Sequence, residues 1–214
     1  KREIFESYGD LFTIRPKPIS INLAYDWLEE CDSSRFEGTI KDLQDYNDKY
    51  LIESLCKQFD YLSSNPKASE MVEKLLKGPF DNAKVLLSDV GSRLFRSLIN
   101  VNPIAAIQNI ERNLSSLSQK DIKLIDGISR RNIIWSLEKG CFYQPTFFIA
   151  SKLMLKFALS ENENYGNNAT NQFLHLFRIH LPGTEANLRE RYQLIEYCLS
   201  EPDLRDFGFK AINS

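Results

Sequence analysis

Apolar residues recur at intervals of three and four along most of this 214-residue chain. One such series begins at Ile40, and its further members are Leu43, Tyr46, Tyr50, Leu51, Leu55, Phe59 and Leu62. This spacing puts apolar side chains on one face of a helix, whereas no segment keeps the period of two that a half-buried strand needs. We therefore expect an all-α protein without a sheet. Its helix content should exceed about 60%, against about one-third in an average domain.

The most apolar helix is expected between Pro145 and Ser160, where only five residues are polar: Thr146, Ser151, Lys152, Lys156 and Ser160. A helix that is apolar almost all round belongs in the interior. We expect four of its side chains to be largely buried and to contact the helices around residues 135 and 173–177: Phe148, Leu153, Leu155 and Leu159. Thr39 and Asp81 are placed to act as N-caps of two earlier helices.

A polar residue followed by proline precedes four of the expected helices, at Asn65-Pro66, Asn102-Pro103, Gln144-Pro145 and Glu201-Pro202. Proline suits the first position of a helix, where its missing N–H costs nothing. Successive prolines are 37, 42 and 57 residues apart, and HEAT and armadillo repeats span about 40–47 residues.

These spacings favour helical hairpins stacked as a HEAT/armadillo-like superhelix, with an irregular helical bundle as the alternative. Residues 1–62 are expected to form an irregular N-terminal helical segment, and residues 63–214 the helical-repeat module. The opening at Lys1 suggests a fragment of a longer protein.

The composition is that of an ordinary soluble protein, with 43% apolar residues and a net charge of −2. No apolar run approaches the roughly 20 residues that cross a bilayer, and no secretion signal is visible. We expect a cytoplasmic protein without a membrane partner. The four cysteines lack metal-ligand spacing and are expected to be buried thiols: Cys31, Cys56, Cys141 and Cys198.

Charge is unevenly distributed, because residues 61–158 carry 14 basic and 8 acidic groups between two acidic ends. Arg130 and Arg131 are the densest basic pair and a candidate basic surface. Such a surface would suit nucleic acid or an acidic partner. Solvated helix faces account for the scattered cations better, so nucleic acid is the less favoured partner.

Recognisable catalytic and cofactor motifs are absent from the sequence, including Walker, dinucleotide-binding, serine-hydrolase and zincin patterns. The two histidines, His175 and His180, are five residues apart, which turns them to different sides of a helix. We expect no enzyme activity, no metal and no cofactor in this chain.

A dense group of polar residues follows the most apolar helix, and with a companion loop it is the candidate site: Glu161, Glu163, Tyr165, Asn167, Asn168 and Thr170, with Thr184 and Glu185. A hydrogen-bonded structural corner is the favoured interpretation, ahead of a binding surface and of acid–base catalysis. Asn168 or Thr170 should cap the helix that follows. The loop around Gly183 and Thr184 should close the other end of that helix.

The run at residues 158–170, ALSENENYGNNAT, together with Phe173, Leu176, Phe177 and the LPGTEA run at 181–186, resembles a segment of large bacterial proteins related to STAND-type NTPases. Many of those proteins look like antiphage-defence systems. The resemblance covers roughly residues 80–214 and implies a helical region that is carboxy-terminal to a nucleotide-binding core. It supplies no active-site residues.

Together these features favour a non-catalytic helical-repeat module for protein contact, sensing or regulation inside a larger STAND-like ATPase. Its partners would be other domains of the same chain or a sensed protein. The alternative is a nucleic-acid-binding repeat domain that uses the basic middle. A hydrolase around the polar residues is a remote third hypothesis.

Overall fold

The computed structural model describes residues 4–9, 11–46, 51, 54–55, 58 and 60–214. Helices account for 72% of these residues, which confirms a mostly helical chain. The expectation that no sheet is present was wrong. Strands β1 (Phe5–Tyr8) and β2 (Leu11–Ile14) pair antiparallel, with Phe5 opposite Ile14. Gly9 allows the tight turn between them because it adopts a positive φ of 61°.

The side of the hairpin that carries Phe5 and Phe12 is not a core face, because both residues are exposed. Each strand has only four residues, which is the shortest run over which the alternation of a half-buried strand can be recognised in a sequence.

Helices α1 (Lys17–Glu30) and α2 (Ser33–Tyr46) follow the hairpin. The Asp32 carboxylate accepts a hydrogen bond from the Arg35 N–H at 2.7 Å and so caps the start of α2. Thr39 is not an N-cap, because it lies inside α2 and donates to the Arg35 carbonyl. Several residues of the apolar series after Ile40 lie outside the described residues.

The four polar-proline pairs mark helix starts as predicted. Asn65 and Asn102 cap α4 (Pro66–Lys77) and α7 (Pro103–Leu114) through their side chains. The later prolines lie in short 3-10 helices, η1 (Gln144–Thr146) and η2 (Pro202–Leu204), which lead directly into α10 (Phe147–Leu159) and α13 (Arg205–Ile212).

The other helices are α5 (Ala83–Leu86), α6 (Asp89–Val101), α8 (Gln119–Leu124), α9 (Gly127–Phe142), α11 (Ala169–His175) and α12 (Leu188–Ser200). Asn82 caps α5 and Ser88 caps α6. Asp81 does not cap a helix, because its carboxylate instead receives the Arg112 guanidinium.

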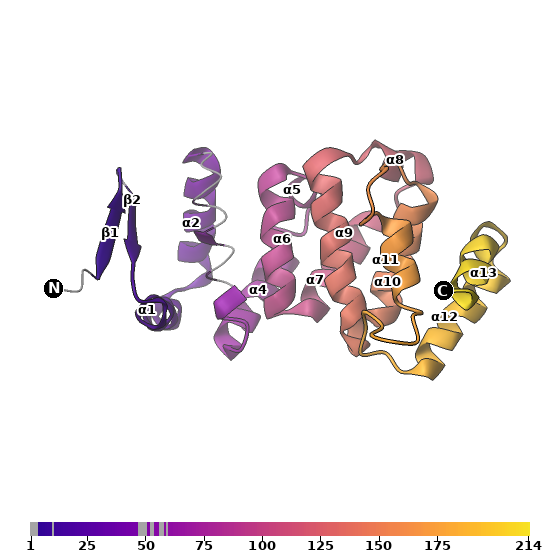
Figure 1. The fold of residues 1–214 in the computed structure, drawn as a ribbon. Coiled ribbons are helices and arrows are strands. Elements are labelled where there is room, and N and C mark those ends of the chain that lie inside the picture. The colour runs from indigo at the N-terminus through magenta and orange to yellow at the C-terminus, as the bar shows by residue number, and fades with distance from the viewer. Residues whose placement is uncertain (1–3, 10, 47–50, 52–53, 56–57, 59) are drawn as a thin grey trace.

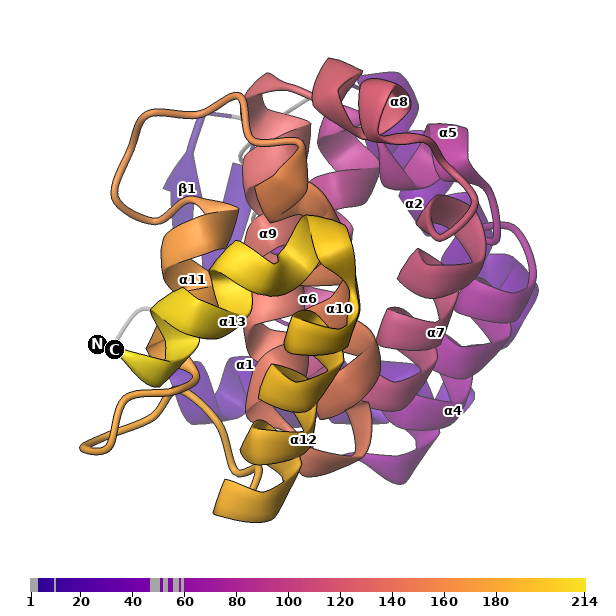
Figure 2. The same cartoon turned by 90° about the vertical axis from the view of Figure 1, so that its right-hand side faces the viewer.

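The helices follow one another along the long axis of the molecule, from the hairpin at one end to α12 and α13 at the other (Figure 1). Helix α7 packs against both α4 and α10, while α9 packs against both α6 and α11. Seen along the axis, α4 and α7 lie on one side and α9 and α11 on the other (Figure 2). Helices α4 and α7 therefore lie in one layer, and α9 and α11 lie in another.

Helix α10 is the centre of the core, since it contacts α7, α8, α9 and α11. Leu153 and Leu155 are buried, as predicted, and α10 meets both of the helices expected around it. Phe148 and Leu159 are half-buried and pack against the edge of the core.

Cationic side chains cap the carboxyl ends of helices that come earlier in the chain. Lys67 of α4 donates to the Glu29 carbonyl at the end of α1. Arg112 of α7 donates to the Leu76 carbonyl at the end of α4, at 3.0 Å. Lys156 of α10 donates to the carbonyls of Leu114 and Ser115 at the end of α7. Each contact satisfies a carbonyl that has no partner within its own helix, and it joins one helix to the next.

Truncation of Leu155 to alanine should lower the free energy of unfolding by about 2–5 kcal/mol, because it leaves a cavity beside residues that cannot fully collapse. Leu155 is 1% exposed, whereas Leu124 on α8 is 80% exposed. The control Leu124→Ala should change stability by less than about 0.5 kcal/mol. Urea denaturation of both variants measures this, and equal losses would contradict the assigned core.

Candidate functional site

Arg130 is the centre of the polar corner and does not belong to a basic surface. Its side chain is fully buried, and its Nε lies 2.6 Å from Oε1 of Glu163, whose side chain is 5% exposed. The expected basic pair is therefore divided, since Arg130 faces inward and Arg131 is exposed. The physical reason is that the fourth residue of α9 faces the ends of two neighbouring helices.

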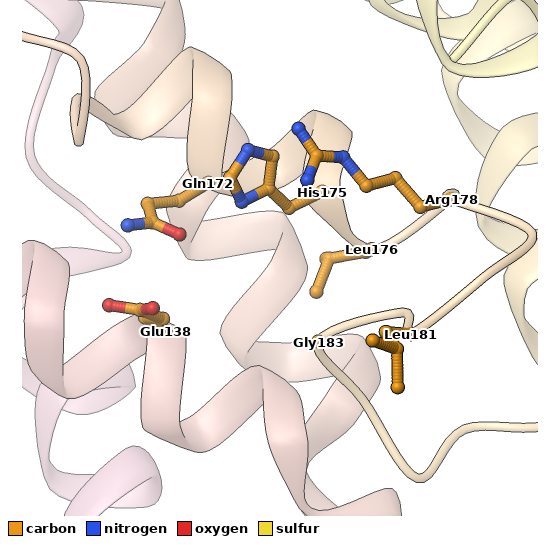
Figure 3. A pocket seen from close by; sticks show the side chains of 7 residues that line it. All are labelled: Glu138, Gln172, His175, Leu176, Arg178, Leu181 and Gly183. Atoms are coloured by element: carbon orange, nitrogen blue, oxygen red, sulfur yellow. The ribbon is translucent and has the colours of Figure 1, made fainter.

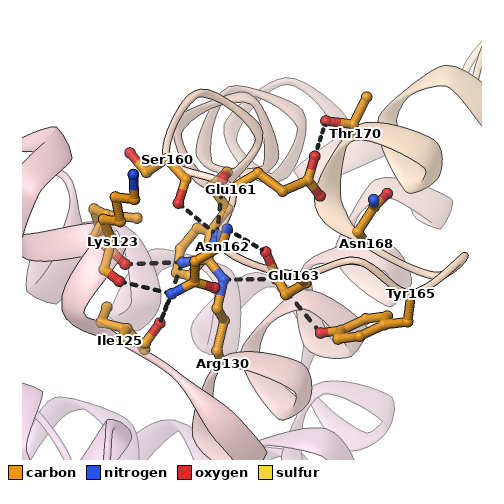
Figure 4. A network of polar contacts seen from close by, with 12 residues as sticks. Lys123, Ile125, Arg130, Ser160, Glu161, Asn162, Glu163, Tyr165, Asn168 and Thr170 are labelled. Carbon is orange, nitrogen blue, oxygen red and sulfur yellow. Dashed lines mark hydrogen bonds and ion pairs between the residues drawn. The ribbon is translucent and has the colours of Figure 1, made fainter.

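The guanidinium of Arg130 donates to carbonyls at the ends of two helices. Its Nη1 reaches the Ile122 carbonyl in α8 at 2.9 Å, and its Nη2 reaches the carbonyls of Phe157 and Ser160 at the end of α10, both at 3.0 Å. One buried cation thus binds α8, α9, α10 and the loop after α10 together (Figure 4).

The loop after α10 closes this corner with further hydrogen bonds. The Asn162 amide donates to the Lys123 carbonyl at 2.7 Å, and the Thr170 hydroxyl donates to the Glu161 carboxylate. Glu161 and Glu163 are thereby occupied by different partners. The arrangement provides no pair of carboxylates facing a common open site.

Asn168 caps α11, as predicted, because its side-chain oxygen accepts the Asn171 N–H at 2.9 Å. Thr170 lies inside α11 and does not cap it. Asn167 is exposed, and its side chain makes no hydrogen bond within the described part of the chain. The ring of Tyr165 packs under the Arg131 guanidinium, 5.1 Å from its centroid, and burial raises the pKa of the Tyr165 hydroxyl.

The companion loop is tied to the end of α9. The Glu185 N–H donates to the Phe142 carbonyl at 2.8 Å, and the Thr184 hydroxyl donates to the same carbonyl at 3.4 Å. Thr184 also accepts the Ala186 N–H at 3.0 Å. Gly183 lies beside the end of α11, so this loop bridges the carboxyl ends of two helices.

Sequence reasoning missed a small hollow between α9, α11 and this loop (Figure 3). Four polar side chains line it together with leucines and a glycine: Glu138, Gln172, His175 and Arg178. Glu138 lies 34 residues before Gln172 in the sequence, and no local pattern announces that the fold brings them together.

The electrostatics of the hollow differ from those of the corner. Burial raises the pKa of the Glu138 carboxyl, although neighbouring Lys139 opposes this. Burial and the Arg178 guanidinium lower the pKa of His175 below its usual value of 6.5. This shift favours the neutral imidazole, which can either donate or accept a hydrogen bond.

Most of the other cations of the basic middle are also engaged. Lys74 and Arg93 each form an ion pair with a carboxylate four residues earlier in the same helix. Arg112 pairs with Asp81. Lys139 donates to the Arg96 carbonyl at 2.9 Å. The positive charges are therefore engaged in separate helix caps and ion pairs.

No protein-family model, no curated protein and no solved structure matches this chain. Over the residues that the structure describes, no helix has both the length and the apolar character to cross a membrane. The same residues contain no group of three or more acidic, histidine or cysteine side chains placed to hold a metal ion. Cys31, Cys141 and Cys198 are buried, and Cys56 lies outside the described residues.

Replacing Arg130 with methionine should lower the free energy of unfolding by about 3–5 kcal/mol, because it removes the cationic partner of the buried Glu163 carboxylate and the hydrogen bonds to the carbonyls at two helix ends. Its neighbour provides the control. Arg131→Met removes one exposed contact with Tyr165 and should cost no more than about 1 kcal/mol. Similar losses in chemical denaturation would show that the corner does not depend on Arg130.

Asn168→Ala should lower the free energy of unfolding by about 0.5–2 kcal/mol, because an N–H of α11 loses its cap. The control Asn167→Ala should change it by less than about 0.5 kcal/mol. Thermal melting of the two variants compares them directly. Unchanged stability of Asn168→Ala, combined with loss of partner binding, would instead make this residue a contact residue.

Proposed function

We propose that this chain is a non-catalytic helical-repeat module that contacts another protein or another domain. Its helical hairpins form a HEAT-like stack in which α4, α7 and α10 are the equivalent first helices. The capping contacts of Arg112 and Lys156 support this equivalence, because each comes from the last turn of its helix and reaches the carboxyl end of α4 or α7. Stacked repeats leave long helix faces free for partners.

The observation that carries the proposal is the outer face of α9. Arg131, Trp135 and Phe142 share this face because they are four and seven residues apart along the helix. Arg96 of α6 packs over the Trp135 ring, 4.2 Å from its centroid, and Tyr165 packs under Arg131. Tryptophan, tyrosine and arginine are the residue types that dominate the energy of protein interfaces.

The wider setting follows from the resemblance of residues 158–186 to STAND-type NTPases. In that setting the module is a cytoplasmic sensing or regulatory region of a larger bacterial ATPase, with a role in antiphage defence. Nucleotide chemistry belongs to another part of such a protein, so the module itself acts by contact.

The alternative, nucleic-acid binding, is less well supported. Arg130 is buried, and Arg112 and Lys156 are engaged at helix ends. The cations of the basic middle therefore do not form the continuous stripe that follows a phosphate backbone.

A photo-crosslinking amino acid placed at Phe142 tests the proposed face in the cells that produce the full-length protein. Phe142 on α9 is 45% exposed, and Ile104 on α7 is a matched control at 48%. We expect a discrete covalent adduct, within the chain or to another protein, from position 142 and not from position 104. The same product from both positions, or none from either, would contradict the assignment.

Fluorescence anisotropy with single-stranded and duplex DNA at two salt concentrations tests the alternative. The contact module should bind neither form appreciably. Tight binding that falls steeply with salt would favour the nucleic-acid function instead.

A further inference from the structure

The hollow between α9, α11 and the loop that follows α11 has opposite charges on its two sides. Glu138 of α9 supplies a carboxylate on one side, and Arg178 supplies a guanidinium on the other. Gln172 and His175 of α11 lie between them (Figure 3). Among the described residues, no hydrogen bond or ion pair engages any of these four side chains.

Hydrogen bonds hold the backbone of the loop that carries Arg178. Arg191 of α12 donates to the backbone carbonyls of Leu176 and Arg178, at 3.3 and 3.1 Å. The far end of the loop is held by the hydrogen bond from Glu185 to the Phe142 carbonyl. The backbone that carries Arg178 is therefore anchored on both sides, which is the condition for a preorganised site.

Leu181 gives an independent sign that the loop is shaped for contact. Its φ is 51°, a left-handed conformation that is unfavourable for a leucine, and its side chain is 95% exposed. Packing does not explain this unfavourable backbone conformation, because the Leu181 side chain is not buried. A role in binding explains it better. Leu181 lines the hollow together with Leu176, so the site has apolar as well as charged walls.

The volume of the hollow limits the size of its ligand. It measures about 100 Å³, which exceeds the space for one water but is smaller than the roughly 300–1,000 Å³ of pockets for drug-sized ligands. A nucleotide is too large. The ligand must therefore be a molecule of few atoms, and to satisfy both sides of the hollow it must carry both charges.

We infer that the hollow between α9 and α11 binds a small zwitterion of the α-amino acid class. Its ammonium group binds Glu138 and the Gln172 carbonyl oxygen, and its carboxylate binds Arg178 and the His175 imidazole. A short apolar side chain contacts Leu176 and Leu181. This small-molecule site goes beyond the protein-contact function, and its test needs no protein partner.

Isothermal titration of the whole chain with glycine and L-alanine at pH 7 tests this inference. We expect saturable binding of at least one of them. Glu138→Gln and Arg178→Gln should each weaken binding at least about tenfold, because each removes one charge-assisted contact. The matched controls Glu196→Gln and Arg189→Gln alter exposed residues of α12 outside the hollow and should leave the affinity unchanged.

Acetate and methylammonium carry one charge each and separate the possible outcomes. Both should bind much more weakly than the zwitterion. If acetate binds as tightly as the zwitterion, and only Arg178→Gln weakens its binding, the hollow is a simple anion site and the inference is overturned. Methylammonium binding with sensitivity to Glu138→Gln alone would make it a cation site. Absence of saturable binding by both amino acids up to their solubility limits would also overturn it, while leaving the crosslinking result at Phe142 unaffected.

Discussion

A helix leaves its last carbonyls without partners, and this protein satisfies many of them with cationic side chains from neighbouring helices. Arg130 is the most deeply buried example, since it joins the end of α10 to α8 and pairs with Glu163. Lys67, Arg112 and Lys156 do the same along the series α1, α4, α7 and α10. Each such contact is a charge-assisted hydrogen bond and also places a positive charge at the negative end of the helix dipole. These contacts join each helix to an earlier one.

This use of charge also determines which surface is left for function. Residues 61–158 carry an excess of basic side chains. Many of these side chains bind helix ends or nearby carboxylates. The outer side of α9 and α11 differs, because Trp135 and Arg131 are presented there beside the hollow that contains Glu138 and His175. The side chains of Glu138, Gln172, His175 and Arg178 thus lie on one adjacent face without a hydrogen bond or ion pair to the described residues, and contact with other molecules is proposed there.

The sequence predicted several features that depend on residues close together in the chain. The helical class follows from apolar spacing, the prolines after Asn65 and Asn102 mark helix starts, and Asn168 caps α11 by accepting an N–H three residues away. Local reasoning failed for Thr39 and Asp81, which cap no helix. Features set by distant contacts were missed. Arg130 and Arg131 are chemically identical neighbours, and only the position of α10 makes one of them a buried anchor. The same applies to the hollow, which three separate segments build. The hairpin was missed because each of its strands has only four residues.

A double-mutant cycle on Arg130 and Glu163 tests most directly whether a buried cation organises this stack. The free energies of unfolding of Arg130→Met, Glu163→Met and the combined variant are compared with that of the unmodified protein. The account predicts strong coupling, with the double variant losing at least about 1 kcal/mol less than the sum of the single losses, because removing both charges leaves neither buried alone. Additive losses would contradict it, since they would mean that Arg130 and Glu163 contribute independently of each other.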